Sequence, residues 1–231
     1  MINFVKKAVF LKKSNAGSDV IRKFFLSKLS NFLIKKEIKK FKKENINYLK
    51  NKKITHDYFS PHTYNFISVI KNKSINNLLE IGSFEGNSSM FFARYLKNTK
   101  IYCVDNWVGT EEYDNLNFKT LEKNFDENLK EFDNVIKKKC TSDEFFLNNN
   151  LTFDLIYIDG YHKAEQVLKD FKNAWKVLNK NGILIFDDFI WKFFDKIEDN
   201  PCYVINAHLK ELKNKFNILK VSNSQLFIQK L

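Results

Sequence analysis

From about residue 61 onward, short apolar runs alternate with segments in which apolar residues recur every three or four positions. The periodic segments predict helices near 87–97, 117–131, 163–179 and 203–214. The apolar runs predict buried strands at 77–81, 100–105, 134–139, 153–159, 182–188, 216–221 and 225–230. Strands that alternate with helices at this spacing are typical of parallel β-α-β units, so we expect an α/β fold with a doubly wound sheet. Only 222–224 separate the last two strands, which predicts an antiparallel closing hairpin.

The N-terminal part of the chain has a different pattern, with apolar residues at helical spacing between lysines. These apolar residues are Ile21, Phe25, Leu29, Phe32, Ile38 and Phe41. They predict one or two amphipathic helices between Asp19 and Leu49. We therefore expect two parts, a basic helical extension at 1–55 and the α/β domain at 56–231.

The positive charge is concentrated in this extension. Residues 1–53 hold 16 of the 39 Lys and Arg residues but only 3 of the 27 Asp and Glu residues, in a chain with a net charge of +12. One interpretation, which we favour, is that the helices pack on the α/β domain with solvated lysines. The other is that they lie on an anionic membrane surface or along a polyanion. Since the remaining residues are almost neutral, we expect no nucleic-acid partner and treat the extension apart from the chemistry.

Length and composition limit the class of protein. A chain of 231 residues with 44% hydrophobic content can bury one full core. Cys103, Cys140 and Cys202 are widely spaced and odd in number, which favours reduced thiols over a disulfide framework. We find neither the roughly 18-residue apolar run of a membrane span nor the apolar core of a signal peptide. We expect a cytoplasmic protein, and homo-oligomers are left open.

Two of the six glycines follow the first predicted strand and precede a helix. At Gly82 and Gly86 the missing side chains let a ligand approach the backbone and the helix N-terminus. The segment GSFEGN departs from the dinucleotide fingerprint GxGxxG at its second glycine. Asp105 ends the next strand, where a carboxylate can accept the ribose hydroxyls of a nucleoside, or else cap a loop. Ser142 and Asp143 follow the third strand, where they could bind an adenine amino group or simply begin a helix.

A second group of polar residues lies at the ends of the fourth and fifth strands: Asp159, His162, Asp187 and Asp188. Adjacent parallel strands lie about 4.8 Å apart, so these side chains can converge. Carboxylates packed so closely repel one another, and a divalent cation with oxygen ligands, such as Mg²⁺, removes that cost. His162 could then take a proton from a hydroxyl group as general base. Alternatively, Asp159 and one of the other two aspartates cap loops, and His162 is an ordinary surface residue.

Several of these segments together resemble class I S-adenosylmethionine-dependent methyltransferases, in particular the group called methyltransferase domain 24. The resemblance covers about 75–231 and rests on LLEIGSFEGNSS, VDNW, LIYIDGYH, the segment ending NKNGILIFDDF, and the C-terminal tail. It implies a seven-stranded Rossmann-like sheet whose last strand is antiparallel. It also implies that Glu80, Gly82 and Ser83 line the methionine end of the cofactor, that Asp105 holds the ribose, and that Trp107 flanks the adenine. Together with Gly86, Ser142 and Asp143 from the residue pattern, these residues form the expected cofactor site.

Related metal-dependent O-methyltransferases act on catechols and on antibiotic sugars. The resemblance to them implies Mg²⁺ bound by Asp159, Asp187 and Asp188, with His162 and Asp159 in catalysis. We therefore expect S-adenosylmethionine-dependent methylation of a hydroxyl group on a saccharide or another small polar acceptor. The loop at 106–117 is expected to close over the cofactor, and 189–201 to form an acceptor wall. A metal-independent methyltransferase, a nucleotide-dependent oxidoreductase and a catalytically idle binding module remain alternatives.

Overall fold

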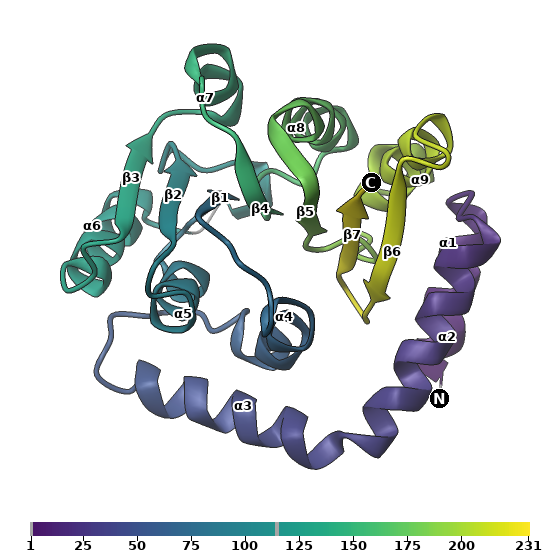
Figure 1. Ribbon diagram of the computed structural model, residues 1–231, viewed down its shortest axis with the longest axis horizontal. Coiled ribbons are helices and arrows are strands. Elements are labelled where there is room, and N and C mark those ends of the chain that lie inside the picture. Colours follow the sequence, from purple (N-terminus) through teal and green to yellow (C-terminus); the bar gives the residue numbers. More distant parts are fainter. Residues whose placement is uncertain (1, 114–115) are drawn as a thin grey trace. The chain divides into compact units, whose positions relative to one another are not determined.

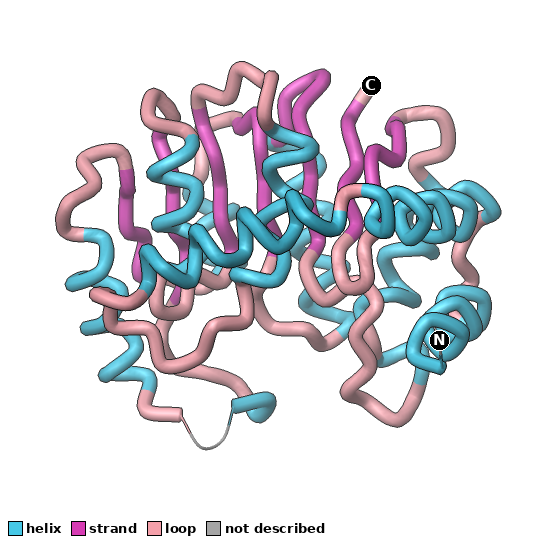
Figure 2. The backbone as a smooth tube through the Cα atoms, turned by 90° about the horizontal axis from the view of Figure 1, so that it is seen from below, coloured by secondary structure: helices cyan, strands magenta, loops and turns pink. Residues whose placement is uncertain are grey.

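The computed structural model describes residues 2–113 and 116–231. The helices are α1 Ile2–Lys13, α2 Ser18–Leu33, α3 Lys35–Leu49, α4 Thr63–Ile70, α5 Asn87–Tyr95, α6 Phe118–Leu129, α7 Ser142–Asn148, α8 Ala164–Val177 and α9 Pro201–Glu211, with short 3-10 turns at Ser60–His62, Glu111–Tyr113 and Ile197–Asp199. The strands are β1 Asn77–Ile81, β2 Lys100–Asp105, β3 Val135–Lys139, β4 Phe153–Ile158, β5 Leu178–Phe186, β6 Phe216–Val221 and β7 Leu226–Lys230. Figures 1 and 2 show these elements along the chain.

The strands form a seven-stranded sheet in the order β3-β2-β1-β4-β5-β7-β6. The chain divides into two compact units. We call Ile34–Asn150 the middle unit, and Met1–Leu33 with Leu151–Leu231 the terminal unit. This is the expected α/β fold of the class I type, with an antiparallel last strand.

In the middle unit, β1 pairs in parallel with β2, and β2 pairs in parallel with β3. Leu78, Leu79 and Ile101 on these strands are fully buried, as expected for strands covered on both faces. Because the strands are parallel, Glu80, Asp105 and the loops that follow β1 and β2 lie at the same edge of this part of the sheet.

In the terminal unit, β4 and β5 are parallel, whereas β7 pairs antiparallel with both β5 and β6. The predicted closing hairpin is therefore confirmed. Helix α8 connects β4 to β5 and buries Val167, Phe171 and Ala174. The carboxyl ends of β4 and β5 lead directly to Asp159 and to the Asp187-Asp188 pair.

The N-terminal helices differ from our expectation in one respect. Helix α2 lies beside β6, and its inner residues Val20 and Phe24 are buried (Figure 1). However, the side chains of Phe25, Leu29 and Phe32 are 48%, 64% and 77% exposed. The favoured interpretation, that the helices pack on the α/β domain, is confirmed for α2, but the helix is attached through Val20 and Phe24 and not through Phe25, Leu29 and Phe32.

Two further observations concern the chain as a whole. Cys103, Cys140 and Cys202 are free thiols, as expected. Within the described ranges 2–113 and 116–231, no helix combines the length and the hydrophobicity that a membrane span requires.

Candidate active site

A glycine loop joins β1 to α5 in the middle unit. Gly82, Phe84 and Gly86 all have positive φ angles, of 85°, 48° and 83°. The Gly82 N–H donates to the Val104 carbonyl at 2.8 Å, which ties the loop to β2. Gly86 directly precedes α5, so free N–H groups of the helix N-terminus are presented at the loop.

Glu80 is fully buried beneath this loop. Its Oε2 accepts a hydrogen bond from Ser83 Oγ at 2.9 Å and another from Ser89 Oγ. Burial raises the pKa of Glu80, and the hydroxyls of Ser88, Ser89 and Ser83 partly oppose that shift. Among the residues that the structure describes, Oε1 has no hydrogen-bond partner. An unpaired buried acceptor is costly, so this atom fits a role toward a donor such as a ligand ammonium group.

Asp105 fastens the glycine loop. Its Oδ2 accepts from the backbone N–H groups of Ser83 and Phe84, both at 3.0 Å, and its Oδ1 accepts from that of Trp107 at 2.7 Å. Burial raises the pKa of Asp105, while these N–H groups act in the opposite direction. A carboxylate has about four acceptor positions, so most of its capacity already serves the loop. We expected Asp105 to accept hydrogen bonds from both ribose hydroxyls. With three N–H groups already bound, few acceptor positions of this carboxylate remain for them.

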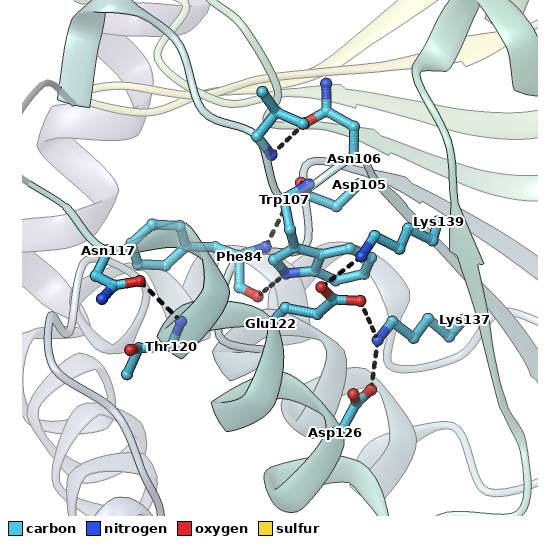
Figure 3. Close-up of polar contacts among 11 residues, drawn as sticks. Phe84, Asp105, Asn106, Trp107, Asn117, Thr120, Glu122, Asp126, Lys137 and Lys139 are labelled. Atoms are coloured by element: carbon cyan, nitrogen blue, oxygen red, sulfur yellow. Dashed lines mark hydrogen bonds and ion pairs between the residues drawn. The ribbon is translucent and has the colours of Figure 1, made fainter.

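Trp107 lies beside Phe84 of the glycine loop (Figure 3). Its ring is 5% exposed and packs against Phe125 with a centroid separation of 4.9 Å, and Lys137 Nζ lies 4.6 Å from the ring centroid. The indole Nε1 donates to the Phe84 carbonyl at 2.8 Å. Trp107 thus supports the loop that follows β1, and its predicted contact with adenine stays a prediction. The predicted closing loop at 106–117 includes 114–115, which lie outside the described residues.

Ser142 and Asp143 occupy the first turn of α7. The cap itself is Thr141, which forms a capping box with Glu144. This arrangement matches the helix-start alternative closely, although it leaves an adenine contact untested.

Glu85 is a loop residue that we did not predict. It is 1% exposed and accepts from the Thr55 N–H at 2.8 Å and from Asn124 Nδ2 at 2.8 Å. Asn128 Nδ2 donates to the Glu85 carbonyl at 2.9 Å and to the Lys53 carbonyl at 3.0 Å. The segment before the domain is therefore clamped to the glycine loop. No sequence motif signals these contacts, because they join residues far apart in the chain.

Replacing Gly86 with alanine is expected to lower the free energy of unfolding by about 1–3 kcal/mol. A Cβ at this position would lie 2.8 Å from Leu129 Cδ1 and 3.2 Å from Phe125 Cδ2, on a backbone with φ of 83°. Denaturant unfolding measures the effect. The matched control is Gly17→Ala, where a Cβ meets nothing within 4 Å. Equal effects in the two variants would contradict the steric explanation.

In the terminal unit, Asp159, His162 and Asp188 form a compact polar group. Their potential ligand atoms all lie within 4.8 Å of one another. His162 Nε2 is 3.4 Å from Asp188 Oδ2 and 3.7 Å from Asp159 Oδ1. The His162 side chain is 6% exposed, whereas the side chains of Asp159 and Asp188 are 31% and 33% exposed. The predicted convergence of these three residues is therefore present.

Asp187 is held differently from the other two aspartates. Its Oδ2 accepts from Gln225 Nε2 at 2.8 Å and contacts the Tyr157 hydroxyl, which also donates to Asp159 Oδ2 at 2.8 Å. We predicted Asp187 as a direct metal ligand, but here its side chain connects β5 to Tyr157 on β4 and Gln225 beside β7. Sequence reasoning missed Tyr157 and Gln225, since an apolar run and a turn give no sign of this role.

The proximity of these carboxylates has an electrostatic cost. Burial, followed by the charge of Asp187, raises the pKa of Asp159 to about 8. Burial and the charges of Asp159 and Asp187 also raise the pKa of Tyr157 well above its usual value. One hydroxyl hydrogen cannot serve two carboxylates at once, so the group favours either an extra proton or a cation.

The segment after β5 forms one wall of this group. The rings of Trp191 and His162 lie 5.0 Å apart, and Trp191 stacks on Phe193 at 5.1 Å. Asn200 is fully buried and orders the segment, because its Oδ1 accepts from the N–H groups of Phe193 and Phe194. The predicted acceptor wall therefore has a defined conformation next to His162.

Lys7 connects the basic extension to this group. Its Nζ donates to the Asn223 carbonyl at 2.6 Å, in the turn between β6 and β7. Burial lowers the pKa of Lys7 and Lys28 lowers it further, while the charge of Asp188 raises it. Lys7 of the extension therefore interacts electrostatically with Asp188.

Sequence comparison supports a methyltransferase. Residues 79–189 match a family model described as a methyltransferase domain. The chain is also 28% identical over 116 residues to uncharacterized protein R132 of Acanthamoeba polyphaga mimivirus. That match covers 48% of this chain and 50% of the relative, so the chain matches about half the length of this curated relative.

Solved structures share the fold. A Staphylococcus aureus protein assigned as a caffeoyl-CoA O-methyltransferase has a TM-score of 0.58 at 18% identity, covering 90% of this chain and all (100%) of that chain. The Bacillus cereus O-methyltransferase in complex with SAH has a TM-score of 0.56 at 12% identity, with 92% and 99% covered. MycE methyltransferase of the mycinamycin biosynthetic pathway, in complex with Mg, SAH and mycinamycin VI, has a TM-score of 0.56 at 15% identity, with 82% and 54% covered. Residues 79–189 thus match the methyltransferase domain family, and the chain has the class I fold of S-adenosylmethionine-dependent methyltransferases.

Proposed function

We propose that the enzyme transfers the methyl group of S-adenosylmethionine to a hydroxyl group of a small polar acceptor, with Mg²⁺ assistance. The acceptor class that we propose first is a saccharide. The observation that carries this proposal is the group formed by Asp159, His162 and Asp188 within 4.8 Å.

The middle unit supplies groups for binding the cofactor. Gly82 and Gly86 leave the backbone accessible before α5, and Glu80 Oε1 is a buried acceptor that could bind the ammonium end of a methionine moiety. Asp105 keeps the loop in this conformation through the N–H groups of Ser83 and Phe84. In this proposal Asp105 positions the loop and also contributes to ribose binding.

The terminal unit supplies the proton chemistry. His162 Nε2 would accept the proton of the acceptor hydroxyl, and the adjacent carboxylates of Asp159 and Asp188 would stabilise the resulting imidazolium. Tyr157 and Gln225 would fix Asp187, which in turn limits the movement of Tyr157 beside Asp159.

The donor set fits a hard divalent cation. Asp159 and Asp188 would hold Mg²⁺ through carboxylate oxygens, while Asp187 stays hydrogen-bonded to Tyr157 and Gln225. Bound Mg²⁺ supplies Lewis acidity, which makes a coordinated hydroxyl easier to deprotonate. The complex of MycE with Mg, SAH and mycinamycin VI supports the proposal by analogy of fold.

The aromatic wall supports a sugar-sized acceptor. Trp191 and Phe193 are stacked next to His162, and flat aromatic faces pack well against the C–H faces of sugar rings. A planar phenol could use the same wall, so the acceptor panel in the test includes both classes.

Calorimetry of the purified chain with S-adenosylmethionine and S-adenosylhomocysteine is the first test. We expect both to bind, and NADH not to bind. Asp105→Asn should weaken cofactor binding about 10-fold or more, because it removes charge-assisted hydrogen bonds from the glycine loop. Absence of binding at about 1 mM ligand would end the proposal.

Turnover assays test the metal and the acceptor separately. Release of S-adenosylhomocysteine is measured with a panel of monosaccharides and catechols, before and after EDTA treatment. We expect turnover with a sugar hydroxyl, its loss in EDTA, and its recovery on addition of Mg²⁺. Full activity in EDTA would contradict the proposed role of Mg²⁺ without contradicting methyl transfer.

A further inference from the structure

The outer side of α2 carries large apolar side chains that the chain leaves in solvent. Phe25, Leu26, Leu29, Phe32 and Leu33 are 48%, 52%, 64%, 77% and 76% exposed. We call these five residues the α2 outer face. Soluble proteins rarely expose so many large apolar side chains on one element without a partner.

The spacing of these residues places them together. Leu29, Phe32 and Leu33 follow Phe25 by four, seven and eight positions, which is one side of an α-helix. The other side attaches the helix, because Val20 and Phe24 are buried and the Phe24 ring stacks on that of Phe4 at 5.0 Å. The α2 outer face is therefore not needed to hold the helix in the terminal unit.

The charge around this face is strongly positive. Residues 4–33 contain six lysines, one arginine and a single acidic residue, Asp19. Asp19 forms an ion pair with Arg22 at 3.5 Å. Lys12 and Lys13 in the last turn of α1 are exposed, and Lys28 lies beside Phe4 on the flank of α2. An apolar helix face with surrounding lysines is the arrangement that binds at the interface of an anionic bilayer.

Other occupants fit this combination less well. A second copy of the chain would bring two strongly positive surfaces together, which is unfavourable. The phosphates of a nucleic acid could bind the lysines, and its bases could stack on Phe25 or Phe32. However, a nucleic acid offers no apolar surface that would cover three exposed leucines. An anionic lipid surface attracts the positive charge through its headgroups and buries the α2 outer face at the boundary of its acyl chains.

We propose that α2 docks the protein on an anionic membrane surface, with its outer face inserted at the boundary between headgroups and acyl chains. Lys12, Lys13 and Lys28 then lie near lipid phosphates. The inference rests on α2 and its surroundings, so it stands independently of the acceptor and of methyl transfer.

The test uses the full chain and sedimentation with vesicles of phosphatidylcholine, with or without phosphatidylserine. We expect binding to the vesicles that contain phosphatidylserine, and weakening of that binding at about 0.5 M salt. The double variant Phe32→Ser, Leu33→Ser should bind at least ~10-fold more weakly, because it removes the two most exposed side chains of the face. The matched control is Leu147→Ser, which removes an 83% exposed leucine from α7 and should leave binding unchanged.

Three outcomes would overturn the proposal. The first is absence of binding to phosphatidylserine vesicles at low salt. The second is equal weakening in Leu147→Ser and in the double variant. The third is a dimer, or an oligonucleotide complex, that the double variant disrupts while vesicle binding is unaffected. Thermal unfolding of each variant checks that the fold is retained.

Discussion

Replacing His162 with glutamine is expected to lower kcat for methyl transfer by about 100- to 10,000-fold, the range for loss of a general base. The imidazole is buried, and its Nε2 lies between Asp188 and Asp159 at 3.4 and 3.7 Å, where the carboxylates would stabilise the protonated ring. Glutamine keeps a polar side chain of similar length but cannot take the proton. Rates of S-adenosylhomocysteine release, with an acceptor that supports turnover, measure the effect.

Cofactor affinity separates this role from a structural one. The residues proposed to bind the cofactor are those of the glycine loop and do not include His162, so calorimetry should give an unchanged affinity for S-adenosylmethionine. His208→Gln is the matched control, since His208 is also buried but contacts Glu211 at 2.7 Å on α9. A similar loss of kcat in both variants would show that any buried histidine in this unit matters only for folding.

The strands of this protein could be predicted closely from the sequence. Strands β1, β2 and β6 have the predicted bounds, because each is a short, mainly apolar run bounded by polar residues. Asp159 and Asp188 were found for the same reason, as the carboxylates that follow the ends of two strands. The fifth predicted strand was displaced, since β5 begins directly after α8 and ends at Phe186, before the Asp187-Asp188 pair.

Contacts between distant segments could not be predicted. Helices α4 and α7 are also missing from the prediction, because both are too short to show a periodic pattern. Helix α7 instead begins with a capping box at Thr141. Folding alone brings α1, β4 and the β6–β7 turn together near the aspartates. These elements carry Lys7, Tyr157 and Gln225. The exposed side of α2 shows a further limit, because helical periodicity identifies an apolar face without telling what covers it.

Replacing Asp159 with asparagine is expected to stabilise the metal-free protein at pH 8. Burial and the charge of Asp187 raise the pKa of Asp159 to about 8, whereas an unfolded aspartate has a pKa of about 3.9. A raised carboxyl pKa contributes stability that is complete below about pH 4 and is lost as the pH rises toward 8. The neutral amide of asparagine does not ionise, so the variant does not lose stability in this way as the pH rises. The variant should therefore gain about 1–3 kcal/mol over the wild type between pH 5 and pH 8, as measured by denaturant unfolding.

The same substitution should abolish turnover, lowering kcat by at least about 100-fold, because Asp159 adjoins His162 and belongs to the proposed cation group. Addition of Mg²⁺ should stabilise the wild type at pH 8 and leave the variant unchanged, since a ligand that binds only the folded state raises its stability. Asp154→Asn is the control on the same strand, where the side chain accepts from Asn179 at 2.8 Å, and it should keep full turnover. If Asp159→Asn instead gains no stability relative to the wild type between pH 5 and pH 8, the carboxyl is ionised at no cost in the folded protein. Asp159 would then need neither a proton nor a cation.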